Sequence, residues 1–343
     1  MTDRRRVAII GLGMAVRPHA KSLVDLRDRV EVAWAFSRSE ERRRAFAERF
    51  DFPLTGDLER ILDDRSVEAV MILTPPNTHL ELVEAFADAG KHILLEKPLE
   101  RSTERALRLV EAAEAAGVIL GVVLQHRFRA ASEHLRELVA SGGLGQLAAA
   151  HVQSPWWRPQ SYYDQPGRGT LERDGGGVLI TQAIHTLDLM LSLTGPVAEV
   201  AAIAGTTALH RMESEDFVGA GLRFANGAPG ALMATTAAYP GMPERIELIG
   251  TKATALLAAG VVTIHHQDGR KESFGEEQGT GGGADPMDFP HDAHRAVLTD
   301  LLDAIAQGRS ARVSGREALK VHRLIDALLQ ASAENQTVAV TND

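Results

Sequence analysis

Short apolar runs alternate with longer segments of helical periodicity over the first third of the chain. The runs at 7–10, 30–35, 67–73, 92–95 and 119–124 have strand length, and helices are expected at 17–26, 40–50, 78–89 and 103–116. This alternation predicts βαβ units that feed a parallel sheet. The nearly all-apolar run at 67–73 is typical of a central strand covered on both faces. Residues 1–124 are therefore expected to form a doubly wound α/β domain.

The pattern changes after residue 124. A helix is expected at 131–141, and strand-length runs follow at 146–153, 197–204, 217–224, 230–237, 245–249 and 254–257. Gly, Pro and Asn turns separate these runs without intervening helices, which is typical of a largely antiparallel sheet. Helices are expected at 293–307 and 316–334, and the Gly-rich stretch 275–288 is either a surface linker or an active-site cover. Residues 125–343 are expected to form a second, α+β domain with a large open sheet.

Composition excludes several kinds of chemistry and partner. The 343 residues include no cysteine, which rules out disulfides, thiolate zinc sites and a cysteine nucleophile. The formal net charge is −9, from 37 Lys and Arg against 46 Asp and Glu, so a nucleic-acid partner is not expected. No apolar stretch approaches the roughly 20 residues that cross a bilayer. We expect a cytoplasmic protein without a membrane partner.

Glycines mark the turn between the first strand and the first helix. Gly11 and Gly13, followed by Met14 and Ala15, lie where backbone can approach a pyrophosphate and where a helix N-terminus offers unpaired N–H groups. The third position of the G-x-G-x-x-G pattern is Val16, and the alternative interpretation is an ordinary tight turn. The position of this turn predicts that residues 1–124 are a dinucleotide-binding Rossmann domain.

The end of the second strand bears on the choice of cofactor. An acidic residue there would hold the 2′-hydroxyl of NAD, whereas a cation would accept the 2′-phosphate of NADP. The sequence has Ser37 and Arg38 and no acid at this turn. We predict a preference for NADP(H), with NAD(H) possible, because Arg38 can form charge-assisted bonds to phosphate. The alternative is that Arg38 is a solvated surface charge.

Further polar residues follow later strands, at the carboxyl edge where open α/β sheets bind ligands. They complete the predicted cofactor-binding set: Thr74, Pro75, Asn77, His79, Glu96, Lys97 and Arg127. Lys97 follows an apolar strand, and partial burial lowers the pKa of an ammonium group toward the range useful for proton transfer. The alternative is a structural pair of Glu96 and Lys97.

The predicted second domain carries candidates for substrate binding. Aromatic faces beside hydrogen-bonding groups suit sugar rings, and the candidates of this kind are Trp157, Arg158, Tyr163 and Arg168. A packing or interface patch is the alternative.

A helix over 178–192 would place Thr181, His185 and Asp188 on one face, with Gln182 beside them. Asp188 could orient the imidazole of His185. The alternative is a satisfied core histidine.

Two groups of histidines in the sequence contain residue types that can bind a metal ion. His265 and His266 are neighbours on an expected strand and point to opposite faces, so they cannot easily share one ion. His291, Asp292 and His294 follow the Gly-rich stretch, and His291 could reach an active-site cleft. No metal site is predicted.

Several of these motifs together resemble one protein family. They are Gly11-Leu12-Gly13 with His19, the turn at 74–79, Glu96-Lys97-Pro98, and Gly175-Gly176-Gly177 followed by His185. The collinear set resembles the Gfo/Idh/MocA family, named for glucose–fructose oxidoreductase and inositol 2-dehydrogenase, over nearly the whole chain.

The resemblance implies a nicotinamide-dependent dehydrogenase or reductase that acts on a sugar or polyol. It also implies that Lys97 and His185 stand at the reaction centre and contact substrate. Many members have an aspartate four residues before the histidine, where this chain has Thr181 with Gln182 beside it. This departure shifts the acid/base role to Lys97, His185 or both.

Hydride transfer between NADP(H) or NAD(H) and a sugar, polyol or keto-sugar is the expected function. Two alternatives remain open: an enzyme that retains its nicotinamide for transient oxidation during glycoside cleavage, and a non-catalytic nicotinamide-sensing regulator. The open sheet of the second domain would present an apolar face. A homodimer or homotetramer that buries this face is expected.

Overall fold

The computed structural model describes residues 4–277 and 289–341, and the chain divides into two compact units. The first unit runs to Gln125 and also contains His291–Leu319. The second contains His126–Pro290 and the chain from Lys320 onward. The Gly-rich stretch 275–288, expected to be a surface linker or an active-site cover, lies almost wholly outside the described residues.

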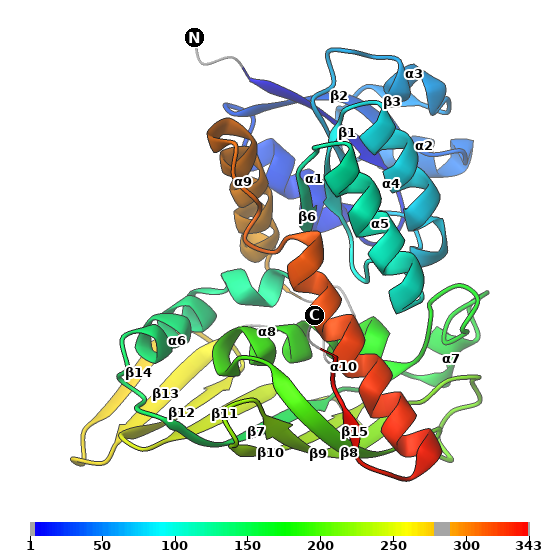
Figure 1. Cartoon of the computed structure of the whole chain (residues 1–343). Coiled ribbons are helices and arrows are strands. Elements are labelled where there is room, and N and C mark those ends of the chain that lie inside the picture. The colour runs from blue at the N-terminus through cyan, green and yellow to red at the C-terminus, as the bar shows by residue number, and fades with distance from the viewer. Residues whose placement is uncertain (1–3, 278–288, 342–343) are drawn as a thin grey trace. The chain divides into compact units, whose positions relative to one another are not determined.

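The first unit is built on a six-stranded parallel sheet (Figure 1). Its strands are β1 (Arg5–Ile10), β2 (Val30–Phe36), β3 (Leu54–Thr55), β4 (Ala69–Ile72), β5 (His92–Leu95) and β6 (Leu120–Val122). Their order across the sheet is β3-β2-β1-β4-β5-β6. Successive strands are added outward on one side of β1 and then, from β4, on its other side, as in doubly wound nucleotide-binding folds. Every residue of β4 is buried, as its apolar run predicts. The α/β fold predicted for this part of the chain is confirmed.

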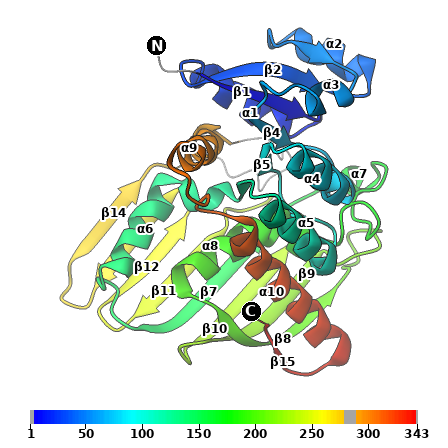
Figure 2. The same cartoon turned by 45° about the horizontal axis from the view of Figure 1, so that its top comes forward.

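Helices cover both faces of this sheet. They are α1 (Val16–Asp25), α2 (Glu40–Ala47), α3 (Glu59–Leu62), the 3-10 turn η1 (Pro76–Thr78), α4 (His79–Asp88), α5 (Thr103–Ala115), α9 (Asp292–Gln307) and the start of α10 (Gly315–Glu334). In Figures 1 and 2, α4 and α5 lie side by side on one face, and α1 and α9 lie on the other. The buried residues of α5, between Ala106 and Ala113, recur at helical spacing. The short elements β3 and α3 were not predicted from the sequence.

The segment 291–319 belongs to the first unit, although the expected division assigns it to the second domain. Helix α9 packs on α1, where His291 Nε2 and Arg295 Nη1 lie 2.8 and 2.7 Å from Asp25 Oδ2. Farther along, the N–H of Val122 donates to the carbonyl of Val313 at 2.9 Å. Contacts between residues so far apart in sequence leave no local pattern that would assign α9 to its unit.

The second unit contains a nine-stranded sheet. Its strands are β7 (Leu147–Pro155), β8 (Val197–Gly205), β9 (Phe217–Phe224), β10 (Pro229–Thr235), β11 (Arg245–Gly250), β12 (Ala253–Ala258), β13 (Val261–His266), β14 (Lys271–Gly275) and β15 (Val338–Ala339). The order is β14-β13-β12-β11-β7-β10-β9-β8-β15, and all neighbours are antiparallel except β7 and β10. The prediction of a large, mainly antiparallel sheet is confirmed.

Helices of the second unit gather on one face of its sheet (Figures 1 and 2). They include the 3-10 turn η2 (Gln125–Phe128), α6 (Ala130–Ala140), α7 (Gln160–Tyr163), the π-helix η3 (Leu179–Ala183), α8 (Ile184–Thr194) and the rest of α10. On β9, Val218 and Leu222 are buried while the intervening residues are more exposed, as expected of a sheet covered on one side. Among the described helices, none combines the length and apolar character needed to span a membrane.

Candidate active site

The glycine turn of the first unit is shaped by close backbone contacts. Gly11 has φ +107°, and a Cβ there would lie 3.0 Å from the carbonyl carbon and oxygen of Leu73. A Cβ on Gly13 would meet no protein atom within 4 Å. Helix α1 then begins after Ala15 without a side-chain cap. Open space beside Gly13 and an uncapped helix N-terminus fit the pyrophosphate of a dinucleotide.

The turn after β2 carries two guanidinium groups. Arg38 is exposed, and the Oγ atom of Ser37 accepts a hydrogen bond from the N–H of Ser39 at 3.3 Å. Arg43, on α2, donates from Nη1 to the backbone carbonyls of Ser37 and Arg38. Sequence analysis missed Arg43, because its place at this turn depends on how α2 begins. The positive charge here suits a phosphate better than a ribose hydroxyl.

The turn after β4 is held together by its own side chains. Thr78 Oγ1 lies 2.7 Å from Thr74 Oγ1 and 2.8 Å from the Pro75 carbonyl oxygen, and its hydroxyl donates a hydrogen bond to one of these two acceptors. His79 follows at the first residue of α4 and is fully buried. Its Nε2 lies 2.8 Å from the carbonyl oxygen of Thr74. The imidazole of this predicted cofactor-binding residue therefore contacts the backbone of the turn.

Lys97 follows β5 at the same carboxyl edge of the sheet. The strand end is aligned by the N–H of Glu96, which donates to the carbonyl of Ile72 at 2.9 Å. Lys97 is half-buried, and its peptide bond to Pro98 is cis. The carboxylate of Glu96 accepts from the backbone N–H of Lys97 at 3.1 Å. Glu96 thus contacts the backbone of the predicted catalytic residue.

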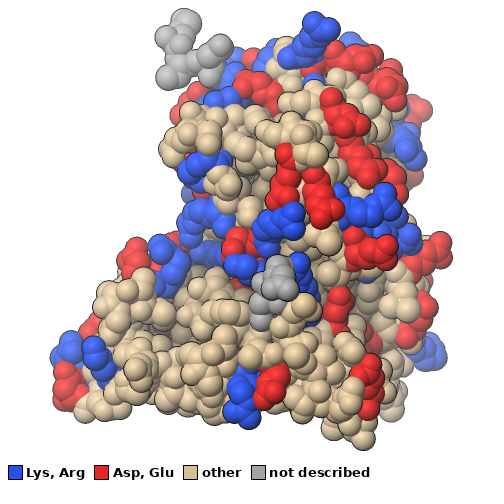
Figure 3. All heavy atoms as spheres, viewed as in Figure 1, with Lys and Arg blue, Asp and Glu red and all other residues tan. Residues whose placement is uncertain are grey.

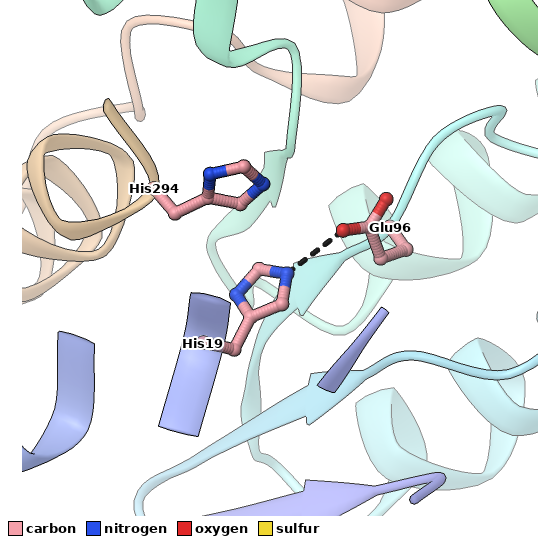
Figure 4. Close-up of side chains that lie close together, drawn as sticks. All are labelled: His19, Glu96 and His294. Carbon is pink, nitrogen blue, oxygen red and sulfur yellow. Dashed lines mark hydrogen bonds and ion pairs between the residues drawn. The ribbon is translucent and has the colours of Figure 1, made fainter. Parts of the chain in front are cut away.

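A cluster of His19, Glu96 and His294 lies beside this turn (Figure 4). Each residue offers one potential metal ligand, and these atoms lie within 4.8 Å of one another. His19 Nε2 is 2.8 Å from Glu96 Oε1, a hydrogen-bond distance. Two ligands on a tetrahedral zinc ion would be about 3.3 Å apart, given bonds of roughly 2.0–2.1 Å. The structure therefore pairs His19 with Glu96 directly. The cluster joins three distant parts of the sequence, so no local spacing of ligand residues indicates it.

In the second unit, His185 lies at the start of α8 against another imidazole. Its ring stacks on that of His126, with centroids 4.8 Å apart and planes inclined by 24°. The preceding residues form the π-helix η3 rather than the α-helical turns expected from 178, so Thr181 does not keep α-helical register with His185. Thr181 Oγ1 lies close to the carbonyl of Gly177 and to Gln182 Oε1.

Residues close to His126 and His185 in the sequence take part in two ion pairs. Arg127 contacts both carboxylate oxygens of Asp188, at 2.7 Å from Nε and 2.6 Å from Nη2. Arg129 donates to Glu244, whose carboxylate lies 3.8 Å from His126 Nδ1. Asp188, which the sequence offered as an orienting group for His185, is thus engaged by Arg127.

The glycine-rich run before η3 has a structural cause. A Cβ on Gly177 would lie 1.8 Å from the carbonyl oxygen of Glu215, so no larger residue fits. The Glu215 carboxylate accepts from the N–H groups of Gly177 and Leu179 at 3.1 and 3.0 Å. Burial raises the pKa of Glu215, and these N–H groups act in the opposite direction. Glu215 therefore holds the start of the segment that carries His185.

The aromatic candidates meet around a histidine that sequence analysis missed. His210 Nδ1 lies 2.6 Å from Asp216 Oδ2, and its Nε2 lies 2.8 Å from the carbonyl oxygen of Arg158. The His210 ring contacts Tyr163 and Trp157, with centroids 4.9 and 6.0 Å away. His210 and Asp216 lie about fifty residues beyond the aromatics, so nothing in the local sequence links them.

The remaining two candidates occupy different surroundings. Arg158 is buried, and its guanidinium lies 5.4 Å from the centre of the Trp156 ring. Arg168 is partly exposed, 5.1 Å from the ring of Tyr162 and 3.9 Å from Asp174. Arg158 thus sits within the packed cluster, whereas Arg168 borders solvent.

Comparison with known proteins identifies relatives of this chain. Residues 5–124 match the model of the GFO/IDH/MocA oxidoreductase family with an NAD-binding Rossmann fold, and residues 132–256 match the C-terminal domain of that family. The myo-inositol 2-dehydrogenase of Thermotoga maritima is 30% identical over 254 residues, covering 72% of this chain and 73% of that protein. The 1,5-anhydro-D-fructose reductase of Ensifer adhaerens is 32% identical over 252 residues, covering 71% and 74%.

Solved structures agree. The WlbA dehydrogenase from Bordetella pertussis, in complex with NADH and UDP-GlcNAcA, is 27% identical with a TM-score of 0.85. The match covers 99% of this chain and 100% of that one. These findings confirm the resemblance drawn from the motifs. The chain belongs to the GFO/IDH/MocA family of oxidoreductases, whose N-terminal domain is an NAD-binding Rossmann fold.

Proposed function

We propose that this protein transfers a hydride between a nicotinamide cofactor and a CH–OH carbon of a sugar or polyol, or the corresponding keto-sugar. One observation carries the proposal: the open turn at Gly13 and the half-buried Lys97 follow strands of one parallel sheet at the same carboxyl edge. The relatives named for inositol and anhydrofructose support a carbohydrate substrate.

The chain's own groups have distinct roles in this proposal. The bound nicotinamide would supply the hydride acceptor or donor. The N–H groups at the start of α1 hold its pyrophosphate, and Lys97 Nζ or the His185 imidazole moves the proton at the substrate oxygen. Trp157 offers aromatic surface to the substrate, with Arg168 at the exposed border, and Tyr163, which is buried against His210, supports this surface from within.

Turnover of a substrate panel tests this role. The purified protein is mixed with NADP⁺ or NAD⁺ and cyclitols, aldoses, anhydrosugars or uronates, and with NADPH and keto-sugars for the reverse reaction, while nicotinamide absorbance is followed. Lys97→Met is expected to lower turnover by about 10²–10⁴-fold. Lys97→Arg keeps the charge but cannot release its proton, so it should fail equally. Cofactor affinity should persist in both.

Two results would contradict the proposal. Unchanged turnover in Lys97→Met would remove Lys97 from the reaction. A protein that binds nicotinamide tightly yet gives no net absorbance change across the panel would favour one of the alternatives. Cleavage of nitrophenyl glycosides without net cofactor consumption would then indicate the retained-cofactor enzyme, and no cleavage would indicate the sensor.

We also propose that NADP(H) is preferred over NAD(H). Arg38 is exposed at the end of β2, and Arg43 adds a second positive charge to the same turn. Arg38→Ala should weaken NADPH binding about tenfold or more and leave NADH binding nearly unchanged, because only NADPH carries the 2′-phosphate. Arg42→Ala removes an exposed charge from the same helix as a control. Equal losses for both cofactors would contradict the preference.

A second copy of the chain is the proposed partner of the open sheet face. The register aligns Ile203, which is 75% exposed, with Gly219 and Met233 across three strands. On the side viewed in Figure 3, the surface of the second unit is largely uncharged. Ile203→Lys is expected to reduce the mass measured by light scattering, whereas Leu209→Lys, outside the strands, should not. A monomeric wild type would contradict this proposal. The cytoplasmic location stays a prediction.

A further inference from the structure

Two buried imidazoles converge on the segment that carries Lys97. His19 lies in α1, the helix that follows the Gly11 turn, and His79 begins α4, the helix that follows the Thr74 turn. Both side chains are fully buried, and both belong to the first unit. Each therefore connects one predicted cofactor-binding turn with the chain around Lys97.

His19 reaches Lys97 through Glu96. His19 Nε2 lies 2.8 Å from one carboxylate oxygen of Glu96, and the other oxygen accepts from the Lys97 N–H at 3.1 Å. Burial raises the pKa of Glu96, but the His19 hydrogen bond and the charges of His19, His294 and Lys97 outweigh it and lower that pKa. The carboxylate therefore stays ionised and accepts from both sides.

His294 completes this side of the arrangement. Its ring meets the His19 ring edge-on, with centroids 5.1 Å apart and planes at 87° (Figure 4). The His19 ring is consequently fixed between α9 and the Glu96 carboxylate, and it has little freedom to rotate away.

His79 holds the other side of Lys97. Its Nδ1 lies 3.0 Å from the Pro98 carbonyl oxygen and 3.1 Å from that of Leu99, while Nε2 lies 2.8 Å from the Thr74 carbonyl oxygen. Desolvation lowers the pKa of His79, and the carbonyl contacts oppose it. The neutral ring has one N–H, which donates to one of these two sides, and the ring itself fills the gap between the Thr74 turn and the two residues that follow Lys97.

We propose that His19 and His79 form a clamp that fixes the backbone of Lys97 on both sides and ties it to the two nucleotide-binding turns. They are positioning residues, since they act through Glu96 and backbone carbonyls rather than by touching the substrate. Filling of the turns by cofactor would thereby set the direction of the Lys97 side chain. The inference rests on the acid/base role of Lys97 in the proposed function.

Variants of His19 separate positioning from packing. His19→Gln keeps an N–H donor near Nε2, whereas His19→Leu removes it. We expect His19→Leu to lower kcat about ten- to a hundredfold with little change in the Kd for NADPH, and His19→Gln to restore most of the loss. The substrate is the one identified by the panel above.

His79 allows the two halves of its bridge to be tested separately. In His79→Asn the amide takes the place of Nδ1 and keeps the side facing Pro98 and Leu99, whereas in His79→Gln it takes the place of Nε2 and keeps the side facing Thr74. We expect His79→Asn to retain more of kcat than His79→Gln. His92→Asn is the matched control, because His92 begins β5 at the end far from Lys97, where its Nδ1 accepts from the Ile119 N–H at 3.0 Å.

A second readout needs no substrate. The pH dependence of Lys97 acetylation by acetic anhydride is followed by mass spectrometry on the NADPH-saturated protein. In His19→Leu, the Glu96 carboxylate loses a donor and acts more strongly on the Lys97 ammonium, so the midpoint should rise by about half a pH unit or more.

The outcomes are distinct. A lower melting temperature with wild-type kcat and an unchanged acetylation midpoint would reduce the histidines to packing and overturn the clamp. Wild-type turnover in Lys97→Met would instead remove the proposed function, while the acetylation midpoint would still report on the clamp. If His19→Leu does not fold, the contrast between His79→Asn and His79→Gln supplies the same decision.

Discussion

The two units build their candidate sites from different materials. In the first unit, the nucleotide site is mostly backbone: a turn at Gly11 and Gly13, an uncapped helix end, and carbonyls held by His79. In the second unit, the site is mostly side chain: the stacked rings of His126 and His185, and two ion pairs that include residues near them in the sequence. A backbone site depends on which residues the turn can accept. A side-chain site depends on partners supplied from elsewhere in the fold.

This difference predicts different sensitivities to mutation. A phosphate bound by main-chain N–H groups is affected chiefly by residues that alter the path of the chain. Buried ion pairs are affected by any change that leaves one charge without its partner. Pyrophosphate binding in the first unit should therefore tolerate most side-chain changes near its turns, whereas the stability of the second unit should fall when one partner of a buried ion pair is removed.

The largest effect is expected when Arg127 is replaced by Leu. Asp188 is 1% exposed and would keep an uncompensated charge, which costs about 3–5 kcal/mol of unfolding free energy. Denaturant titration measures the loss, and Arg127→Leu combined with Asp188→Leu should recover much of it. The affinity for NADPH is measured in the same variants. If NADPH affinity fell severely in an Arg127 variant of wild-type stability, Arg127 would be the cofactor contact predicted from the sequence.

The same contrast explains how far the sequence could be interpreted. Each of the turns at Gly11 and Lys97 is one continuous stretch of sequence that follows an apolar strand. Periodicity and residue type were therefore enough to find them. Glu215 holds the start of the His185 segment from 38 residues away, and His210 joins the aromatics from a distant loop. Such partners come together only in the folded chain.

Local pattern also failed where geometry departs from the regular period. The segment before His185 is a π-helix, so counting at α-helical spacing from Thr181 does not give the face on which His185 lies. Helix α9 has an ordinary amphipathic pattern that does not reveal its packing on α1. In both cases the deciding contacts are tertiary.

An intermediate effect is expected from acid. Burial lowers the pKa of His322, in the part of α10 that belongs to the second unit, from 6.5 to about 4. The unfolded chain therefore binds this proton more readily, and stability falls as the pH drops from 6.5 toward 4, by about 3 kcal/mol in total. His322→Leu should flatten this dependence. Hydrogen exchange in acid should rise first in β8 and β9 of the wild type; an earlier rise in β1 and β4 would place the acid-sensitive group in the first unit.

The smallest effect separates two neighbouring glycines. Gly11→Ala forces a Cβ to 3.0 Å from the Leu73 backbone at φ +107°, which should cost about 1–3 kcal/mol of stability. Gly13→Ala meets no protein atom within 4 Å, so its stability should match the wild type while its Kd for NADPH rises, because the methyl group occupies space proposed for the pyrophosphate. Thermal unfolding with and without NADPH measures both quantities. A Gly13→Ala protein with unchanged NADPH affinity would mean that the open space beside this residue does not receive the cofactor, and the uncapped start of α1 would then be the part of the turn left to bind the pyrophosphate.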